Sequence, residues 1–350
     1  MIIGCDFHTR YQQIAVANDE TGELLLERRL DHQSGEAEAF YRDLHKPARV
    51  GIEATGPIHW FERLLAELGH ELWIGDSTKI RAAEVRKQKT DERDARLILD
   101  LLLAKRFPKI WLPTPSERDL RQLLWHRHKL VTLRTMLGNQ LHFLAMSQGL
   151  CRKQKLFSKK GRGELTGLTL GPWASRRREE LLKLLDQLDP AIADLDRAVS
   201  EEAKRRDDAV LLMTHPGIGP VTSLAFVLAI GPVARFPRSK KIASYIGLNP
   251  SEASSGGKRR LGAISKQGNT MVRWLLIETV HHAVKQDPEL RQDYQRLKFR
   301  RGHAVAKVAI ARKLAVRMYW MLRSGAAYAQ LVRRQGSPGA TLVDASPSLG

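Results

Sequence analysis

The first hundred residues alternate short apolar runs with amphipathic stretches. Strand-like patterns cover residues 2–7, 11–17, 23–30, 49–54 and 71–75, and helical spacing covers residues 35–45 and 58–68. The resulting order is β-β-β-α-β-α-β, a strand meander followed by strands that alternate with helices. This order predicts an α/β domain whose later strands form a parallel sheet covered by helices.

After residue 90 the pattern is almost wholly helical. The two longest stretches, 116–147 and 173–206, have the spacing of a helical hairpin or coiled coil, for which a plain spacer and a dimerisation arm are equally good interpretations. We predict a mobile, basic loop at 151–171 between them and a disordered tail at 326–350. The remaining predicted helices cover residues 91–105, 221–230, 239–246, 269–285 and 302–323.

These patterns divide the chain into four parts. Residues 1–112 form the α/β domain, residues 113–206 a helical linker, residues 207–325 a mostly helical domain, and residues 326–350 the tail. No apolar run is long enough to span a bilayer and no secretory signal is visible, so we expect a soluble, cytoplasmic protein with no membrane partner.

The charge of the chain is large and uneven. Its 350 residues carry a formal net charge of +20 with a pI near 10.2, which predicts a polyanionic partner such as nucleic acid. Residues 1–100 carry 14 basic and 19 acidic side chains, whereas residues 256–323 carry 16 basic and 4 acidic ones. The C-terminal part is therefore expected to bind the nucleic-acid backbone directly, and the N-terminal part only where metal ions offset its acids.

Four acids stand where a sheet and a helix would bring them together. Asp6 ends the first strand, Glu53 ends a later strand, and Asp91 and Asp94 open a helix three residues apart. Sites in α/β sheets gather at the carboxyl ends of strands, so we expect the first two acids side by side with the helix across them. Neighbouring carboxylates repel one another unless cations bind, and oxygen ligands suit Mg²⁺ or Mn²⁺. Two such ions can assist an in-line phosphoryl displacement.

Each acid also has a plain structural interpretation. Asp6 could cap a turn, Glu53 could cap the following helix, and Asp91 and Asp94 suit the positive end of their own helix. For any single acid this interpretation is at least as good as a metal site. Two acids at strand ends among apolar or small neighbours favour the metal site. His8, His281 and His282 are further candidates for proton transfer, but the twelve histidines of the chain are scattered without regular spacing, so the pattern gives them little weight.

A second stretch with chemical character covers residues 247–262. Glycine lets a backbone approach a phosphate closely, and cations stabilise the charge that gathers on it. Taken alone the stretch favours phosphate binding, and attack by a serine on a phosphodiester is the alternative. Its chemical groups are two adjacent serines, Ser254 and Ser255, a Gly-Gly pair and three cations, Lys258, Arg259 and Arg260.

A Gly-x-Gly turn precedes this stretch. Gly217 and Gly219 stand just before a predicted helix, where free backbone N–H groups can hold a phosphate. This is the helix-hairpin-helix pattern. It is only moderately specific, because Pro-Gly turns before helices are common.

Together these motifs resemble the DEDD-type insertion-sequence transposases, which are bridge-RNA-guided serine recombinases related to the Piv DNA invertase. The motifs occur in family order and span most of the chain. They are Gly4-Cys5-Asp6, Gly51-Ile52-Glu53-Ala54-Thr55-Gly56, Lys89-Thr90-Asp91-Glu92-Arg93-Asp94-Ala95, Pro216-Gly217-Ile218-Gly219, Arg235-Phe236, Tyr245-Ile246-Gly247-Leu248-Asn249-Pro250, Ser255-Gly256-Gly257-Lys258 and Ser265-Lys266-Gln267-Gly268-Asn269.

The resemblance implies a RuvC-like, RNase H-type N-terminal domain that binds Mg²⁺ or Mn²⁺ through Asp6, Glu53, Asp91 and Asp94. It implies that Ser255 is the nucleophile that forms a phosphoserine link to DNA, with Ser254 as a rival next to it. It also implies donor and target DNA, a structured guide RNA, an oligomer and a bacterial, nucleoid-associated location. The nucleic-acid contacts expected from the motifs are Gly217, Gly219, Lys258, Arg259, Arg260 and Lys266.

Two other functions use the same features. A metal-dependent, junction-resolving endonuclease would use the four acids with water as the nucleophile, and its serine stretch would only bind. A non-catalytic nucleic-acid scaffold would keep the basic helices, and its acids would serve as caps. The acids at strand ends speak against the scaffold, whereas the basic helices do not discriminate between the three functions.

Overall fold

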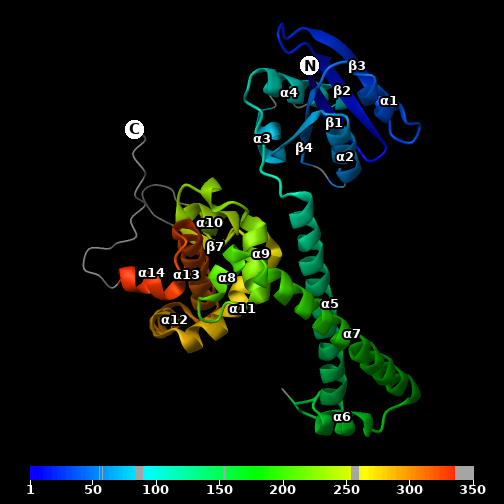
Figure 1. Cartoon of the computed structure of the whole chain (residues 1–350). Helices are drawn as coiled ribbons and strands as arrows, with labels where there is room; N and C mark the ends of the chain where they lie inside the picture. Colours follow the sequence, from blue (N-terminus) through cyan, green and yellow to red (C-terminus); the bar gives the residue numbers. More distant parts are fainter. Residues whose placement is uncertain (55, 57, 84–89, 153–154, 254–259, 336–350) are drawn as a thin grey trace. The chain divides into compact units, whose positions relative to one another are not determined.

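The computed structural model describes the chain except for residues 55, 57, 84–89, 153–154, 254–259 and 336–350 and the side chains of residues 261 and 333–335. The chain divides into two compact units, Met1–Leu112 and Pro113–Gly350 (Figure 1). Each unit is described by itself.

The first unit is built on a mixed five-stranded sheet with the order β3-β2-β1-β4-β5. The first three strands form an antiparallel meander, and the last two lie parallel to β1. This is the RNase H-like arrangement that the motifs imply, and the predicted β-β-β-α-β-α-β order is confirmed. The strands are β1 (Ile2–Phe7), β2 (Tyr11–Ala17), β3 (Leu24–Asp31), β4 (Arg49–Glu53) and β5 (Glu71–Gly75).

Helices cover both faces of this sheet. In β1, Ile3, Cys5 and Phe7 belong to one core cluster, with buried residues of α1 and α2, whereas Ile2 belongs to a second cluster, with α4. Because successive strand residues point to opposite faces, Asp6 lies on the side of α4. The helices are α1 (Glu36–Arg42), α2 (His59–Glu67), α3 (Ser77–Ala82) and α4 (Asp91–Leu103).

The second unit begins with a long two-helix arm (Figure 1). Helix α5 (Pro115–Ser147) packs along α7 (Pro172–Lys204) through a cluster that includes Leu141 and Leu181. The prediction of a mere loop at 151–171 is wrong, because α6 (Lys159–Thr166) forms there. Ser158 caps its first turn by accepting a hydrogen bond from the backbone N–H of Gly161 at 3.2 Å, which is a local signal for a helix start.

The rest of the second unit is a helical body, as predicted. Its centre is α9, in which residues 222–230 are all buried. None of the helices among the described residues is long and apolar enough to cross a membrane. The elements of the body are α8 (Asp207–Met213), α9 (Pro220–Ile230), η1 (Val233–Arg235), α10 (Ser239–Tyr245), β6 (Pro250–Glu252), β7 (Leu261–Ile264), α11 (Thr270–Gln286), α12 (Pro288–Arg301), α13 (His303–Ser324) and α14 (Tyr328–Gln335).

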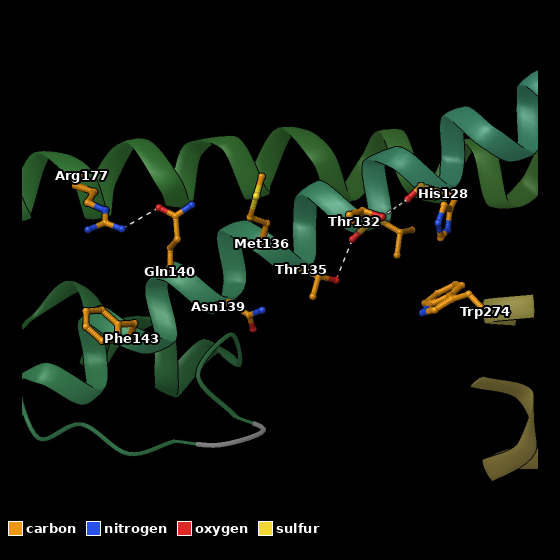
Figure 2. A pocket seen from close by; sticks show the side chains of 10 residues that line it. His128, Thr132, Thr135, Met136, Asn139, Gln140, Phe143, Arg177 and Trp274 are labelled. Atoms are coloured by element: carbon orange, nitrogen blue, oxygen red, sulfur yellow. Dashed lines mark hydrogen bonds between the residues drawn. The ribbon is translucent and has the colours of Figure 1, made fainter. Parts of the chain in front are cut away.

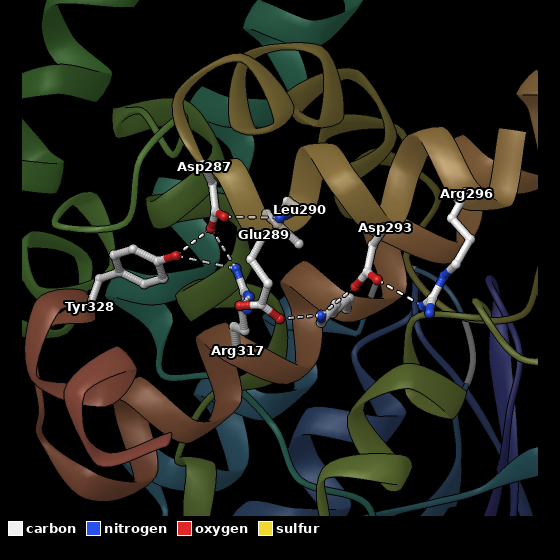
Figure 3. Close-up of polar contacts among 8 residues, drawn as sticks. Asp287, Glu289, Leu290, Asp293, Arg296, Arg317 and Tyr328 are labelled. Atoms are coloured by element: carbon white, nitrogen blue, oxygen red, sulfur yellow. Dashed lines mark hydrogen bonds and ion pairs between the residues drawn. The ribbon is translucent and has the colours of Figure 1, made fainter. Parts of the chain in front are cut away.

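The last helix corrects the prediction of a tail that is disordered from residue 326. Helix α14 is held by Tyr328, whose hydroxyl donates to Asp287 and whose backbone N–H donates to Thr214 Oγ1 at 3.0 Å. The same Asp287 accepts from Arg317 Nη1 at 2.7 Å and from the N–H of Leu290, so one buried carboxylate joins three helices (Figure 3). Residues 336–350 lie outside the described part of the chain.

Candidate active site

The candidate site of the first unit lies where β1 ends and α4 begins. Thr90 caps α4 by accepting a hydrogen bond from the N–H of Arg93 at 3.4 Å, so Asp91 and Asp94 occupy its first turn. Helix α4 crosses β1 very closely, because a Cβ atom at Gly4 would lie 2.3 Å from the carbonyl oxygen of Ala95. Glycine at this position therefore sets the distance between the helix and the strand.

Three side chains converge at this point. One ligand atom from each of Asp6, His8 and Asp91 lies within 4.8 Å of the other two. His8 Nε2 is 3.0 Å from Asp6 Oδ2 and 3.6 Å from Asp91 Oδ2. Tyr11, at the start of β2, donates its hydroxyl to Asp91 Oδ2 at 2.8 Å and so fixes that carboxylate.

The electrostatics of the cluster favour a cation. Burial raises the pKa of Asp6 above its usual value, the neighbouring His8 lowers it in part, and the negative charges of Asp94 and Asp91 raise it further. The pKa of Tyr11 is also raised, chiefly because its hydroxyl donates to Asp91. A positive ion would relieve the repulsion that disfavours the ionised form of Asp6.

The other two predicted ligands are placed differently. Glu53 ends β4, and its strand runs parallel to β1 with Ile52 opposite Cys5, but its carboxylate pairs with Arg81 Nη2 at 3.4 Å. This pairing occupies Oε1 of Glu53, so a metal ion would have to bind the other oxygen or displace the guanidinium. Asp94 acts on Asp6 through its charge. The cluster of three is thus Asp6, His8 and Asp91, in which the imidazole stands where sequence reasoning placed only carboxylates.

The donor set of the cluster fits a divalent metal ion. Carboxylate oxygens suit Mg²⁺ and Mn²⁺, and an imidazole nitrogen suits the softer transition-metal ions better than Mg²⁺. The oxygens of Asp6 and Asp91 with the Nε2 atom of His8 provide both types of donor.

The predicted serine loop belongs to the second unit, where it joins β6 to β7. Its chemical residues, Ser254, Ser255, Lys258 and Arg259, lie outside the described part of the chain. The residues on either side are paired, because the N–H of Ala253 donates to the carbonyl oxygen of Arg260 at 3.0 Å. Lys266 is exposed, and its N–H donates to the carbonyl oxygen of Gly247 at 3.2 Å.

One residue that sequence reasoning missed ties the two ends of this hairpin together. Arg273 is buried in α11, and its Nη1 atom donates to the carbonyl oxygens of Ile246 at 2.9 Å and Gln267 at 2.7 Å. These carbonyl groups lie just before and just after the hairpin, so the guanidinium holds its base closed. The only local signal was a cation in the otherwise apolar first turns of α11.

The two glycines of the Gly-x-Gly turn have different surroundings. Gly217 has φ of +84°, and a Cβ there would lie 2.6 Å from the backbone nitrogen of Ala283, so close packing on α11 requires this glycine. Gly219 is the N-cap of α9, and a Cβ there would meet no atom within 4 Å. Gly219 is therefore the better placed of the two to face a phosphate.

A separate groove of about 720 Å³ runs along α5 in the second unit. Thr132, Thr135 and Asn139 on α5 line it, and Phe143 and Trp274 lie toward its two ends (Figure 2). No carboxylate lines this groove, so the acid chemistry of the first unit has no counterpart in it.

Comparisons with known proteins give matches along most of the chain. A transposase model of the DEDD, IS110 type matches residues 3–145, and a model described as transposase, IS116/IS110/IS902 family, matches residues 209–295. A probable family 20 transposase of Pseudomonas aeruginosa is 31% identical, over 81% of this chain and 86% of its own length. The transposase for insertion sequence element IS1111A of Coxiella burnetii is 29% identical, over 85% of this chain and 83% of its own length.

Proposed function

Because the chain belongs to the IS110/IS116/IS902 family of insertion-sequence transposases, we propose that it cuts and rejoins DNA strands at a composite site. One half of the site is the acidic cluster of the first unit, and the other half is the serine loop of the second. The convergence of Asp6, His8 and Asp91 on one point is the observation that carries this proposal.

The acidic half would hold a divalent metal ion. Asp6, His8 and Asp91 would bind the ion directly, with Glu53 and Asp94 as further carboxylates of the same edge. When bound, Mg²⁺ or Mn²⁺ would stabilise charge on a scissile phosphate and favour ionisation of the attacking hydroxyl. The hydrogen bond from Tyr11 keeps Asp91 oriented toward this position.

The serine half supplies the nucleophile. The Oγ atom of Ser255 attacks the phosphorus atom and forms a phosphoserine ester, while the bond from phosphorus to the neighbouring nucleotide breaks and its oxygen takes up a proton. The reverse reaction with another strand end rejoins DNA without a high-energy cofactor, because the ester conserves the bond energy. A serine hydroxyl is a weak nucleophile unless it is activated, which is why both halves are needed.

The nucleic-acid partners follow from charge and family. Lys258, Arg259, Arg260 and Lys266 around the hairpin would hold phosphates, and Gly219 would present N–H groups at the start of α9. The guide RNA and the oligomer are included because the family resemblance implies both. The net charge of +20 supports nucleic-acid partners in general.

A covalent adduct tests the proposal. The full chain is incubated with Mg²⁺, its RNA and a DNA substrate whose cleaved end diffuses away, and the products are separated under denaturing conditions. The wild type and Ser254→Ala should form a protein–DNA adduct that mass spectrometry maps to Ser255, whereas Ser255→Ala and Asp6→Asn should not. Cleavage without an adduct would point to a metal-dependent endonuclease that uses water. Nucleic-acid binding that Asp6→Ala leaves intact, without cleavage by the wild type or the variant, would point to a non-catalytic scaffold.

A further inference from the structure

The C-terminal end of α12 carries the most exposed large apolar side chain among the described residues. Phe299 is 93% exposed. The helix faces its core with Leu290 and Tyr294, and Phe299 lies five residues after Tyr294, which is about 140° around the helix. Phe299 thus points away from the core, and packing within the second unit does not explain an aromatic residue there.

The charged residues that flank Phe299 in the sequence of α12 are all basic. The acids of α12 lie in its first half, where Glu289 and Asp293 pair with Lys313, Arg317 and Arg296 (Figure 3). After Asp293 the sequence contains no acid until Asp344.

Three of the cations beside the ring in the sequence are not engaged in ion pairs within the described part of the chain. Within the described part of the chain Lys298, Arg300 and Arg301 are exposed and form no ion pair. Cations suit the negative end of a helix, which accounts for their sign, but the helix dipole gives no reason for an exposed ring among them.

We propose that the end of α12 binds nucleic acid, with Phe299 stacked on an unpaired base and Lys298, Arg300 and Arg301 on the adjacent phosphates. An aromatic face between cations is what a single strand needs, because every base has a flat face and every linkage carries a negative charge. A continuous duplex hides the faces of its bases, so the ligand is a single strand, a loop, a bulge or a frayed end. The inference rests on the proposed function only for its premise that the partner is a nucleic acid.

The test compares single-stranded and duplex oligonucleotides that carry 2-aminopurine, in DNA and in RNA form, with the full chain. The wild type should quench the fluorescence of the single strand. Phe299→Ala should lose about 5- to 100-fold in affinity for the single strand, as the loss of one base–aromatic stack predicts, and less than 2-fold for the duplex. Phe299→Trp should retain the affinity. Replacing the three cations by glutamine should lower the salt dependence of single-strand binding by about 2 in slope.

Trp173 at the start of α7, which is 77% exposed, provides the matched control. Trp173→Ala should bind both oligonucleotides as the wild type does. The inference is overturned if Phe299→Ala binds the single strand normally, loses affinity for strand and duplex alike, or loses no more than Trp173→Ala. A parallel assay measures binding to vesicles of phosphatidylcholine and phosphatidylserine. The inference is also overturned if Phe299→Ala loses binding to these vesicles and to no oligonucleotide. Ser255→Ala should keep this binding, so a missing adduct and a missing stack are separate results.

Discussion

Gly4→Ala tests how the packing of α4 on β1 sets the active site. The added Cβ would lie 2.3 Å from the carbonyl oxygen of Ala95 and 2.4 Å from the nitrogen of Leu99, and both atoms belong to helix backbone. Ordinary contact needs about 3.4 Å, so α4 has to move outward by about 1 Å, and Asp91 moves with it. Overpacking of this kind lowers the free energy of unfolding by about 1–3 kcal/mol. A misplacement of about 1 Å at a reacting centre reduces the rate by about 100-fold.

The neighbouring strand offers a matched control. Gly51 is the partner of Gly4 in the parallel register of β1 and β4, and its Cβ would also meet α4. There the nearest atom is Cδ1 of Leu102 at 2.6 Å, which is the end of a flexible side chain that can turn away. Gly51→Ala should therefore lower the melting temperature without moving the acids.

The assay measures adduct formation at saturating DNA, divalent-metal affinity by calorimetry and the melting temperature of each full-length variant. We expect Gly4→Ala to lose about 100-fold in rate together with metal affinity, and Gly51→Ala to stay within a few-fold of the wild type. The reasoning fails if Gly4→Ala and Gly51→Ala lower the melting temperature equally and also lose equal rates of adduct formation. It also fails if Gly4→Ala keeps the metal affinity of the wild type.

Three further predictions concern the charges. The pKa of Asp6 is raised in the folded state, so stability that is present below its unfolded pKa is lost as the pH rises through the folded pKa. Asp6→Asn should therefore raise the melting temperature of the metal-free protein at pH 7. The same substitution should abolish the rise in melting temperature that Mg²⁺ gives the wild type. Mn²⁺ bound to the wild type should show nitrogen modulation in pulsed EPR, and its persistence in His8→Ala would exclude this imidazole as a ligand. Asp287→Ala leaves Glu289 as the one acid that pairs with buried Arg317 among the described residues, so urea unfolding should show a loss of about 3–5 kcal/mol, and a loss below about 1 kcal/mol would contradict the assigned role.

Local patterns predicted most of the fold because they repeat along each element. The strands of the first unit and its long helices came from apolar periodicity and were found within one or two residues of their observed ends. Helix α12 was not predicted, because only Leu290, Tyr294 and Leu297 mark its inner face in a very polar sequence. Helix α14 was not predicted, because it depends on the hydrogen bond from Tyr328 to Asp287, which is 41 residues away in the sequence.

The candidate site was only partly accessible to the same reasoning. The meeting of Asp6 and Asp91 follows from strand ends and helix starts, which a sequence displays. The contacts of His8 and Tyr11 depend on how β1 turns into β2, and the pairing of Glu53 with Arg81 depends on α3, which was not predicted. The assignment of Ser255 stays a prediction, since that residue lies outside the described part of the chain.

The distribution of charge gives the two-unit arrangement a consequence for regulation. The acids Asp6 and Asp91 belong to the unit Met1–Leu112, whereas the hairpin that Arg273 holds belongs to the unit Pro113–Gly350. The first unit carries 17 basic and 19 acidic side chains, so it lacks the basic excess of the second unit. The acids clustered at Asp6 would repel a phosphate until an ion neutralises them, whereas the basic helices of the second unit would attract DNA with or without the ion. If the ion admits DNA to the first unit, linkage requires that DNA tighten the binding of the ion by the same factor. Under the function proposed above, the chain would hold DNA without cutting it when metal is absent, and it would cut only when DNA and ion are both bound.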